Sequence, residues 1–409
     1  MTQPARTDGR EALVRLMATL ALMTIGASAM YVVPVILPAV QADFGVPRAQ
    51  ASAPYSLLMI GYGIGGFLMG RLADRRGLVL PLVIGALSLG AGYLLAAHAH
   101  TLAVFTAAHA LLMGLFGSSV TFSPLLADTS LWWAKRRGIA VAVCASGNYV
   151  GGAIWPPVVQ HFVESVGWRA TYTGMGIGCS AAMLLLAFAM RRRPPQVEDA
   201  PAAESRARGS NRPFGLSPIA ATALLCIAGL SCCVAMSMPQ VHIVAYCVDL
   251  GYGPARGAQM LALMLGFGIV SRLASGVICD RVGGLRTLLL GSFLQGVALL
   301  LFLPFKGLVP LYVISILFGL FQGGIVPSYA IIVREHFPAR EAGARVGATI
   351  MCTLIGMALG GWMSGEIFDL TGSYRAAFIN GLLWNLVNVS IATWLLRRSI
   401  GRLALARGA

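Results

Sequence analysis

Residues 70–77 read Gly-Arg-Leu-Ala-Asp-Arg-Arg-Gly, and residues 276–283 read Gly-Val-Ile-Cys-Asp-Arg-Val-Gly. Both stretches share the pattern Gly-x-x-x-Asp-Arg-x-Gly, and each follows a long apolar run. The same offset of 206 residues carries Gly-Trp-Arg-Ala at 167–170 onto Ser-Tyr-Arg-Ala at 373–376. The chain therefore consists of two copies of one unit of roughly 200 residues.

The composition indicates a membrane protein. Hydrophobic residues make up 57% of the 409 residues and charged residues only 11%, against roughly 25% charged in soluble domains. Apolar stretches long enough to cross a hydrocarbon layer of about 30 Å are expected near 14–40, 50–73, 78–98, 101–127, 138–163, 169–190, 217–248, 256–279, 285–305, 308–333, 342–368 and 375–396. The predicted fold class is an all-α membrane protein with twelve transmembrane helices in two pseudosymmetric six-helix bundles, an arrangement typical of secondary transporters.

The predicted bundles are residues 1–190 and 217–409. Between them, residues 191–216 begin Arg-Arg-Arg-Pro-Pro and contain almost no large apolar side chain, which predicts a flexible linker. All but six of the 30 Lys and Arg residues fall in the termini, the linker and four loops on the same side. The positive-inside rule makes that side cytoplasmic. We expect an integral protein of a bacterial inner membrane with both termini in the cytoplasm, and a net charge of +15 that requires no nucleic-acid partner.

Catalytic and metal chemistry find little support in the sequence. The eight cysteines lie within or at the edges of apolar runs, and none forms a ligand-spaced cluster with His. No nucleophile with a base and no phosphate-binding loop occurs, so we expect no enzyme activity, no metal and no cofactor. Residues 61–66 satisfy G-x-G-x-x-G, but they lie inside a predicted membrane helix. Glycines four apart, either Gly61 with Gly65 or Gly66 with Gly70, predict close helix packing instead.

The two Asp-Arg loops and the twelve spans resemble the major facilitator superfamily. Further stretches resemble its bacterial monocarboxylate porter and oxalate-formate antiporter branch: Trp132-Trp-Ala-Lys-Arg-Arg-Gly-Ile-Ala140 with Ala145-Ser-Gly147, Val241-His-Ile-Val-Ala-Tyr246, and Phe368-Asp-Leu-Thr-Gly-Ser-Tyr-Arg375. This resemblance implies the major facilitator fold and transport of a small organic anion by alternating access.

Arg272 is the main candidate binding residue. It lies eight residues before Asp280, so it is about 12 Å up the helix from the cytoplasmic loop. An arginine inside the membrane is a functional hypothesis by default, and no acidic residue is expected at the same depth. The resemblance implies that this arginine binds the substrate carboxylate. The alternative is a structural arginine that caps backbone carbonyls of an unwound helix.

The number of buried cations bears on the substrate. The predicted eleventh helix carries only Arg345, near its cytoplasmic end, whereas the related oxalate porters are expected to offer a second cation there. One central guanidinium suits one carboxylate, which favours a monocarboxylate. Other polar or aromatic side chains that we expect in the pocket lie in the middle of spans; they are Tyr31, Asn148, Gln240, His242, Gln322 and Tyr329.

Proton coupling is open. Eukaryotic members of the resembled branch carry an aspartate one turn before the arginine, but this chain has Gly268 there. A co-transported proton would use His242 or the substrate's own carboxyl group, and the remaining alternative is anion exchange without protons.

The Asp-Arg loops are predicted to control conformation. By resemblance, Asp74 contacts the start of the eleventh helix, and Arg75 pairs with an acidic residue at the end of the fourth, for which Asp128 qualifies. In the second copy Asp280 and Arg281 make the mirrored contacts, with Glu335 as the acidic partner. These pairs are expected to hold the cytoplasmic side closed, and breaking them shifts state populations.

Three other functions remain as alternatives. A drug or small-molecule exporter of the same superfamily is expected to expose a membrane carboxylate, which this chain lacks. An anion exchanger for dicarboxylates would require a second buried cation. A sensor without transport would require a cytoplasmic output domain. The expected partners are thus a small organic anion, a co-transported proton as an option, and the lipid bilayer, with the protein working as a monomer.

Overall fold

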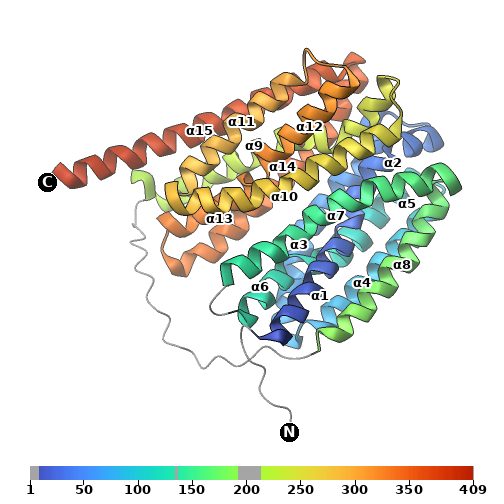
Figure 1. Ribbon diagram of the computed structural model, residues 1–409, viewed down its shortest axis with the longest axis horizontal. Coiled ribbons are helices and arrows are strands. Elements are labelled where there is room, and N and C mark those ends of the chain that lie inside the picture. The colour runs from blue at the N-terminus through green and yellow to red at the C-terminus, as the bar shows by residue number, and fades with distance from the viewer. Residues whose placement is uncertain (1–8, 134–136, 192–212, 409) are drawn as a thin grey trace, which may run out of the picture. The chain divides into compact units, whose positions relative to one another are not determined.

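The structure is a computed structural model that describes residues 9–133, 137–191 and 213–408. All regular secondary structure in these ranges is helical (Figure 1). Twelve helical segments are long and apolar enough to cross a membrane. The prediction of an all-α protein with twelve membrane spans is therefore confirmed.

In the first half, two spans are composite. The first comprises α1 (Arg10–Gly26) and α2 (Ser28–Phe44), and the fourth comprises α5 (Leu102–Ala107), the π-helix η1 (Ala108–Ser118), the 3₁₀ turn η2 (Ser119–Thr121) and α6 (Ser123–Trp132). The other four are α3 (Arg48–Arg76), α4 (Val79–Ala97), α7 (Arg137–Val166) and α8 (Trp168–Ala189).

The second half starts with a short turn, η3 (Pro213–Gly215). Its spans are α9 (Pro218–Asp249), α10 (Pro254–Val282), α11 (Gly284–Leu301), the pair α12 (Leu308–Gln322) and α13 (Ile325–His336), α14 (Ala339–Thr371) and α15 (Tyr374–Gly408). The fourth span is thus interrupted in both copies. In the second copy the interruption is the pair Gly323 and Gly324, with φ of −58° and −90°.

The chain folds into two compact units. Unit 1 is Met1–Glu198 with Val241–Gly266, and unit 2 is Asp199–Gln240 with Phe267–Ala409. The end of α9, the following loop and the start of α10 therefore belong to unit 1. The predicted bundle boundaries stay a prediction, and most of the predicted linker lies outside the described residues.

Close helix packing in unit 1 follows one of the two glycine pairs in the sequence. A Cβ atom at Gly61 or Gly65 would collide with backbone oxygens of η1, those of Ala110 and Leu115. A Cβ atom at Gly70 would meet nothing within 4 Å, and one at Gly66 only a serine hydroxyl at 3.6 Å. Gly61 and Gly65 thus allow α3 to approach η1 closely, whereas Gly66 and Gly70 have no such role in this structure.

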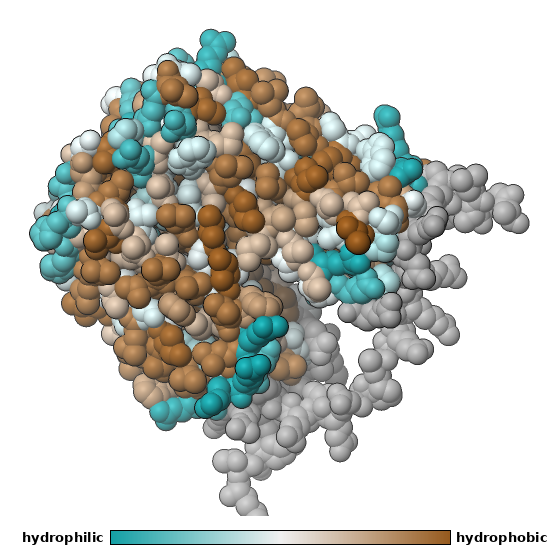
Figure 2. Space-filling view, turned by 180° about the vertical axis from the view of Figure 1, so that it is seen from behind, coloured by the Kyte–Doolittle hydropathy of each residue, from teal (hydrophilic) through white to brown (hydrophobic). Residues whose placement is uncertain are grey.

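The surface is rich in apolar side chains, as expected where lipid replaces water. Large hydrophobic residues with high exposure include Ile219, Leu370, Leu185 and Val309 at 80%, 78%, 72% and 71%. Figure 2 shows apolar residues over much of one face of the molecule. Soluble monomers rarely expose apolar patches larger than a few hundred Å², so this surface supports the membrane assignment.

Candidate functional site

Arg272 lies on α10 in unit 2 and is half-buried. Its Nε atom donates to the backbone oxygen of Gly323, at 3.4 Å. Gly323 is the first residue of the interruption between α12 and α13. The side chain of Arg272 therefore reaches the place where the tenth span loses its regular helical hydrogen bonding.

Small residues bring α10 and the interruption together. A Cβ atom at Gly323 would collide with the backbone oxygen of Gly268 and lie 2.8 Å from the Cβ atom of Ser271. A Cβ atom at Gly324 would collide with the side chain of Ser275. Gly268, where eukaryotic members of the resembled branch carry an aspartate, is thus part of a tight helix crossing. This crossing fixes the register of Arg272 against the interruption.

Two predicted pocket residues of unit 2 bind each other. Gln240 on α9 donates from Nε2 to Oε1 of Gln322, at 3.0 Å. Both side chains are buried, Gln322 completely. Gln322 immediately precedes Gly323 in the chain. This amide pair is therefore next in sequence to the carbonyl that accepts the hydrogen bond from Arg272.

Tyr329, a third predicted pocket residue, belongs to a buried polar network. Its hydroxyl donates to Oδ1 of Asn388 on α15 at 2.9 Å, and Nδ2 of Asn388 donates to Oγ of Ser292 on α11 at 2.7 Å. Tyr329 is fully buried. In this structure its hydroxyl therefore joins α13 to α11 and α15, and its predicted substrate contact stays a prediction.

In unit 1, the structure brings Tyr31 and Asn148 together. The Tyr31 hydroxyl on α2 donates to Oδ1 of Asn148 on α7, at 2.7 Å. One turn further along α7, a Cβ atom at Gly152 would lie 2.9 Å from Cζ of Tyr31 and would collide with Leu265 of α10. The absence of a side chain at Gly152 thus makes room for the Tyr31 ring. His242 is also in unit 1, and it is fully buried.

The acidic residue predicted for the first cytoplasmic contact has a different partner here. Asp128 accepts two hydrogen bonds from Arg15 of α1, with Nε to Oδ2 at 2.7 Å and Nη2 to Oδ1 at 2.8 Å. Arg15 also donates to the backbone oxygen of Met190 and lies over the Trp132 ring. Both charged side chains are at least nine-tenths buried, whereas Arg75 is exposed. The predicted contact of Arg75 with Asp128 is not formed in this structure.

The corresponding acid of the second copy caps a helix. Both carboxylate oxygens of Glu335 accept from the backbone N–H of Gly284, each at 3.1 Å, and Gly284 is the first residue of α11. A carboxylate at a helix N-terminus interacts favourably with the helix dipole. Arg281, Asp74 and Asp280 are exposed. Arg281 forms no ion pair with Glu335 in the described part of the chain, so the predicted pair is not formed here either.

Arg345 of α14 is part of the helix packing in unit 2. Its guanidinium donates to Glu341 at 2.6 Å, to the backbone oxygen of Pro218 at 3.0 Å and to the Thr222 hydroxyl at 2.5 Å. These contacts account for the cation that the sequence places near the start of the eleventh helix.

Sequence reasoning missed three features. The interruption at Gly323 and Gly324 had a signal, a glycine pair followed by Pro327 in mid-span, which is typical of a helix break. The pair of Arg15 with Asp128 and the pair of Arg48 with Asp249 had none. Arg48 donates to both carboxylate oxygens of Asp249, at 2.6 and 3.2 Å, although 201 residues separate them.

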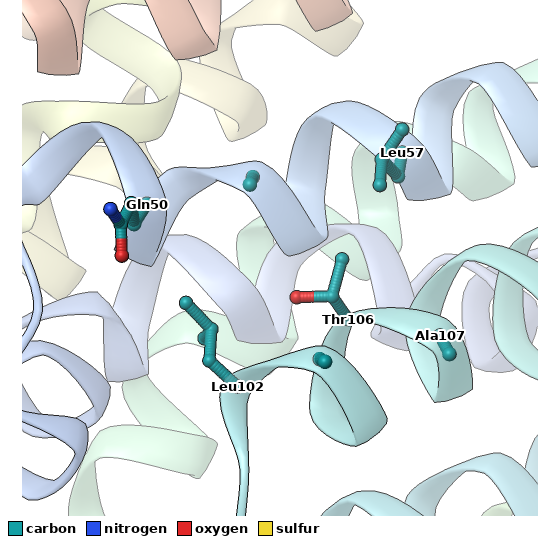
Figure 3. A pocket seen from close by; sticks show the side chains of 7 residues that line it. Gln50, Leu57, Leu102, Thr106 and Ala107 are labelled. Carbon is teal, nitrogen blue, oxygen red and sulfur yellow. The ribbon is translucent and has the colours of Figure 1, made fainter.

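A groove on unit 1 provides no second candidate site. It has a volume of about 420 Å³ and lies between α3 and α5 (Figure 3). Its lining is almost entirely apolar, with Gln50 and Thr106 as the polar residues. Within the described residues, no group of three or more His, Cys, Asp and Glu could hold a metal ion.

Comparisons with known proteins agree with this architecture. The family model of the Major Facilitator Superfamily matches residues 18–360 and 276–405. Monocarboxylate transporter 13 of Rattus norvegicus is 28% identical over 335 residues, which cover 80% of this chain and 75% of that protein. The uncharacterized MFS-type transporter YcxA of Bacillus subtilis (strain 168) is 25% identical over 339 residues, covering 81% and 82%. A bacterial homolog of the human lysosomal transporter Spinster, solved in an inward-facing conformation, has the same fold, with a TM-score of 0.69 and 13% identity over 98% of both chains.

Proposed function

Because this chain belongs to the major facilitator superfamily, we propose that it is a secondary active transporter for a small monocarboxylate, with Arg272 binding the carboxylate. The chain is a membrane transporter of that superfamily, with relatives named monocarboxylate transporters. The proposal adds the substrate class, the binding residue and transport by alternating access. We also propose a bacterial inner membrane, cytoplasmic termini and a functional monomer.

The observation that carries the proposal is the position of Arg272 at a helix interruption. A guanidinium within a membrane helix is costly and is usually retained for function. Many secondary transporters bind substrates at interrupted helices, because the N-terminus of a half-helix has a partial positive charge. Helix α13 starts at Ile325, two residues after the carbonyl that Arg272 contacts. A carboxylate there would meet two sources of positive potential.

The charge count favours a monoanion. Arg345, the cation of the predicted eleventh helix, is held by Glu341 and by the start of α9. A single guanidinium can bind one carboxylate through two parallel hydrogen bonds. Dicarboxylate exchange is therefore the less favoured alternative.

Uptake of radiolabelled monoacids into proteoliposomes tests the proposal. We expect Arg272→Ala to abolish uptake while the protein remains folded in detergent, and Arg272→Lys to fail largely because an ammonium cannot make the two-pronged contact. Arg256→Gln is the matched control, since Arg256 lies on the same helix and is exposed. It should transport at the normal rate.

Arg272→Gln separates binding from a structural role. Glutamine retains an N–H donor for the Gly323 carbonyl but has no charge. If Arg272 only caps that carbonyl, Arg272→Gln should transport well, and this result would overturn the proposal. Preferential exchange of oxalate over formate and acetate by the wild type would instead favour the dicarboxylate alternative.

A further inference from the structure

An exposed aromatic ring lies near the end of the sixth span in each copy of the repeat. Phe188 of α8 is 52% exposed and Trp394 of α15 is 44% exposed, and the two positions are 206 residues apart, the offset of the repeat. The Cζ atom of Arg191 lies 4.3 Å from the centroid of the Phe188 ring, and that of Arg398 lies 4.7 Å from the centroid of the Trp394 ring. The sixth span of each copy thus ends with the same pair, an arginine stacked on an exposed ring.

Helix length places both rings at a membrane–water interface. Trp168 at the start of α8 is 20 residues before Phe188, and Tyr374 at the start of α15 is 20 residues before Trp394. At 1.5 Å per residue, each interval spans about 30 Å, the thickness of the hydrocarbon layer. Aromatic side chains are enriched at both interfaces of a membrane. The stacked guanidiniums therefore lie at the level of the lipid headgroups.

The charge around these arginines is positive. Both are exposed, and neither guanidinium has an ion pair or a hydrogen bond with another residue in the described ranges. The last forty residues of the chain contain no Asp or Glu, whereas Arg397, Arg402 and Arg407 add positive charge after Trp394. A guanidinium stacked on a ring retains N–H donors for a phosphate. Basic clusters just outside a membrane helix attract anionic lipids.

A third stacked pair lacks these features. Arg71 lies 4.2 Å from the centroid of the Phe67 ring, near the end of α3. Asp74, three residues further on, places a negative charge beside it on the helix surface. The equivalent positions in the second copy are Leu273 and Val277, so this pair is not repeated. Repetition and excess positive charge distinguish the ends of α8 and α15.

We propose that the ends of α8 and α15 each bind the headgroup of an anionic phospholipid. In each site the arginine, Arg191 or Arg398, contacts the phosphate, and the ring contacts the glycerol and the upper part of an acyl chain. Stacking on the ring holds the guanidinium at this depth, which reduces the side-chain freedom lost on binding. These sites do not depend on the identity of the transported substrate.

Native mass spectrometry of the full chain tests this with dioleoylphosphatidylglycerol and dioleoylphosphatidylcholine, which have the same acyl chains and differ in headgroup charge. We expect the wild type to bind phosphatidylglycerol more tightly. Arg398→Gln should weaken phosphatidylglycerol binding at one site about fivefold, and Arg191→Gln should do the same at the other, with phosphatidylcholine binding unchanged. The double variant should lose both of the tightly held phosphatidylglycerol molecules.

Arg256→Gln is the matched control, because it removes the same charge from an exposed arginine whose partner is the Gln259 side chain. It should leave the lipid preference unchanged. Trp394→Phe should retain the preference, since the first copy already has phenylalanine at this position, and Trp394→Leu should reduce it about threefold. Equal binding of both lipids by the wild type, or equal losses in Arg398→Gln and Arg256→Gln, would overturn the proposal. Thermal unfolding in detergent shows which variants are folded, and separate variants test the two sites, so one that does not fold leaves the other to decide.

Discussion

Asp43 and Asp249 occupy equivalent positions in the two copies of the repeat, 206 residues apart, yet their partners differ. Asp43 pairs with Arg169 at 2.8 Å. The residue equivalent to Arg169 in the second copy is Arg375, but Asp249 pairs instead with Arg48 of α3, at 2.6 Å. The repeat thus predicts where charged residues lie along the helices without predicting which charges meet. This second pairing lies within unit 1, to which the end of α9 belongs.

A second pair of positions shows the same divergence at the centre of the spans. Arg272 is four residues before Gly276, and its equivalent in the first copy is Gly66, four residues before Gly70. A Cβ atom at Gly66 would meet only one atom within 4 Å. In the first copy this position carries no side chain, whereas in the second it carries the candidate binding residue. We infer that the two copies share a framework and that only the second supplies the charge.

The largest effect should come from the acids at the ends of the fourth spans. Asp128→Asn leaves Arg15 buried without its counter-charge, which we expect to destabilise the protein by about 3–5 kcal/mol. Glu335→Gln removes only a partly exposed charge from a helix N-terminus and should cost about 0.3–1 kcal/mol. Thermal unfolding in detergent checks both. Equal losses of stability in the two variants would show that Asp128 and Glu335 stabilise the two copies to the same extent.

The next effect concerns Asp249 and Asp43. The Arg48 side chain is 8% exposed, against 40% for Arg169, so water screens the first pair much less. We predict that Asp249→Asn lowers the initial uptake rate about tenfold. Losing a charged hydrogen bond of this kind shifts the balance between the conformational states of the transporter. Asp43→Asn should change it little.

A charge reversal sharpens that prediction. The double variant Arg48→Asp with Asp249→Arg should recover much of the rate that either single reversal loses, since the pair is restored with opposite polarity. No recovery, together with normal folding, would mean that the pair has no role in transport.

The exposed aspartates of the two Asp-Arg loops should have smaller effects. Asp74→Asn and Asp280→Asn are expected to slow net transport, while substrate binding at equilibrium survives in at least one orientation. Asp280 lies about 12 Å along α10 from Arg272, so it cannot act directly on the bound anion. Scintillation proximity binding of labelled acid measures this. Complete loss of binding by a folded variant would contradict the prediction.

The smallest effect is expected from His242, whose equivalent in the first copy is Ile36. If this histidine relays protons, uptake should be faster at pH 5.5 than at pH 7.5, values that bracket the ordinary imidazole pKa of about 6.5, and His242→Gln should remove the difference. A wild type with acid stimulation that His242→Gln retains would point to protons carried by the substrate. A wild type without pH response and with acceleration by anion on the far side would indicate exchange.

The sequence was sufficient to predict the fold because the fold depends on the mean hydropathy of long segments. Twelve apolar stretches and a repeated loop predict twelve spans, and errors at single positions cancel. The glycine pair Gly61 and Gly65 was also predictable, since spacing along one helix determines its face. Of the candidate site, the sequence identified the residues Arg272, Tyr31, Asn148, Gln240 and Gln322. It did not predict the hydrogen bond of Tyr31 to Asn148 or the one between Gln240 and Gln322.

The remaining contacts depend on tertiary geometry that no local pattern encodes. Arg15 with Asp128 and Arg48 with Asp249 join residues 113 and 201 positions apart. Tyr329 was a reasonable pocket candidate by its depth, yet its hydroxyl is bound to Asn388. Depth in the membrane follows from counting residues, but the direction in which a side chain points depends on the rotation of its helix.

The interrupted tenth span also has a consequence for biogenesis. Helix α12 has 15 residues and α13 has 12, which correspond to about 22 Å and 18 Å. Neither would cross a hydrocarbon layer of about 30 Å alone. We therefore expect the insertion machinery to handle Leu308–His336 as one continuous hydrophobic segment, whose mean hydropathy reaches 1.9. The break would then form only when α10 packs against Gly323, so that the candidate site is completed late, after the chain is already in the bilayer.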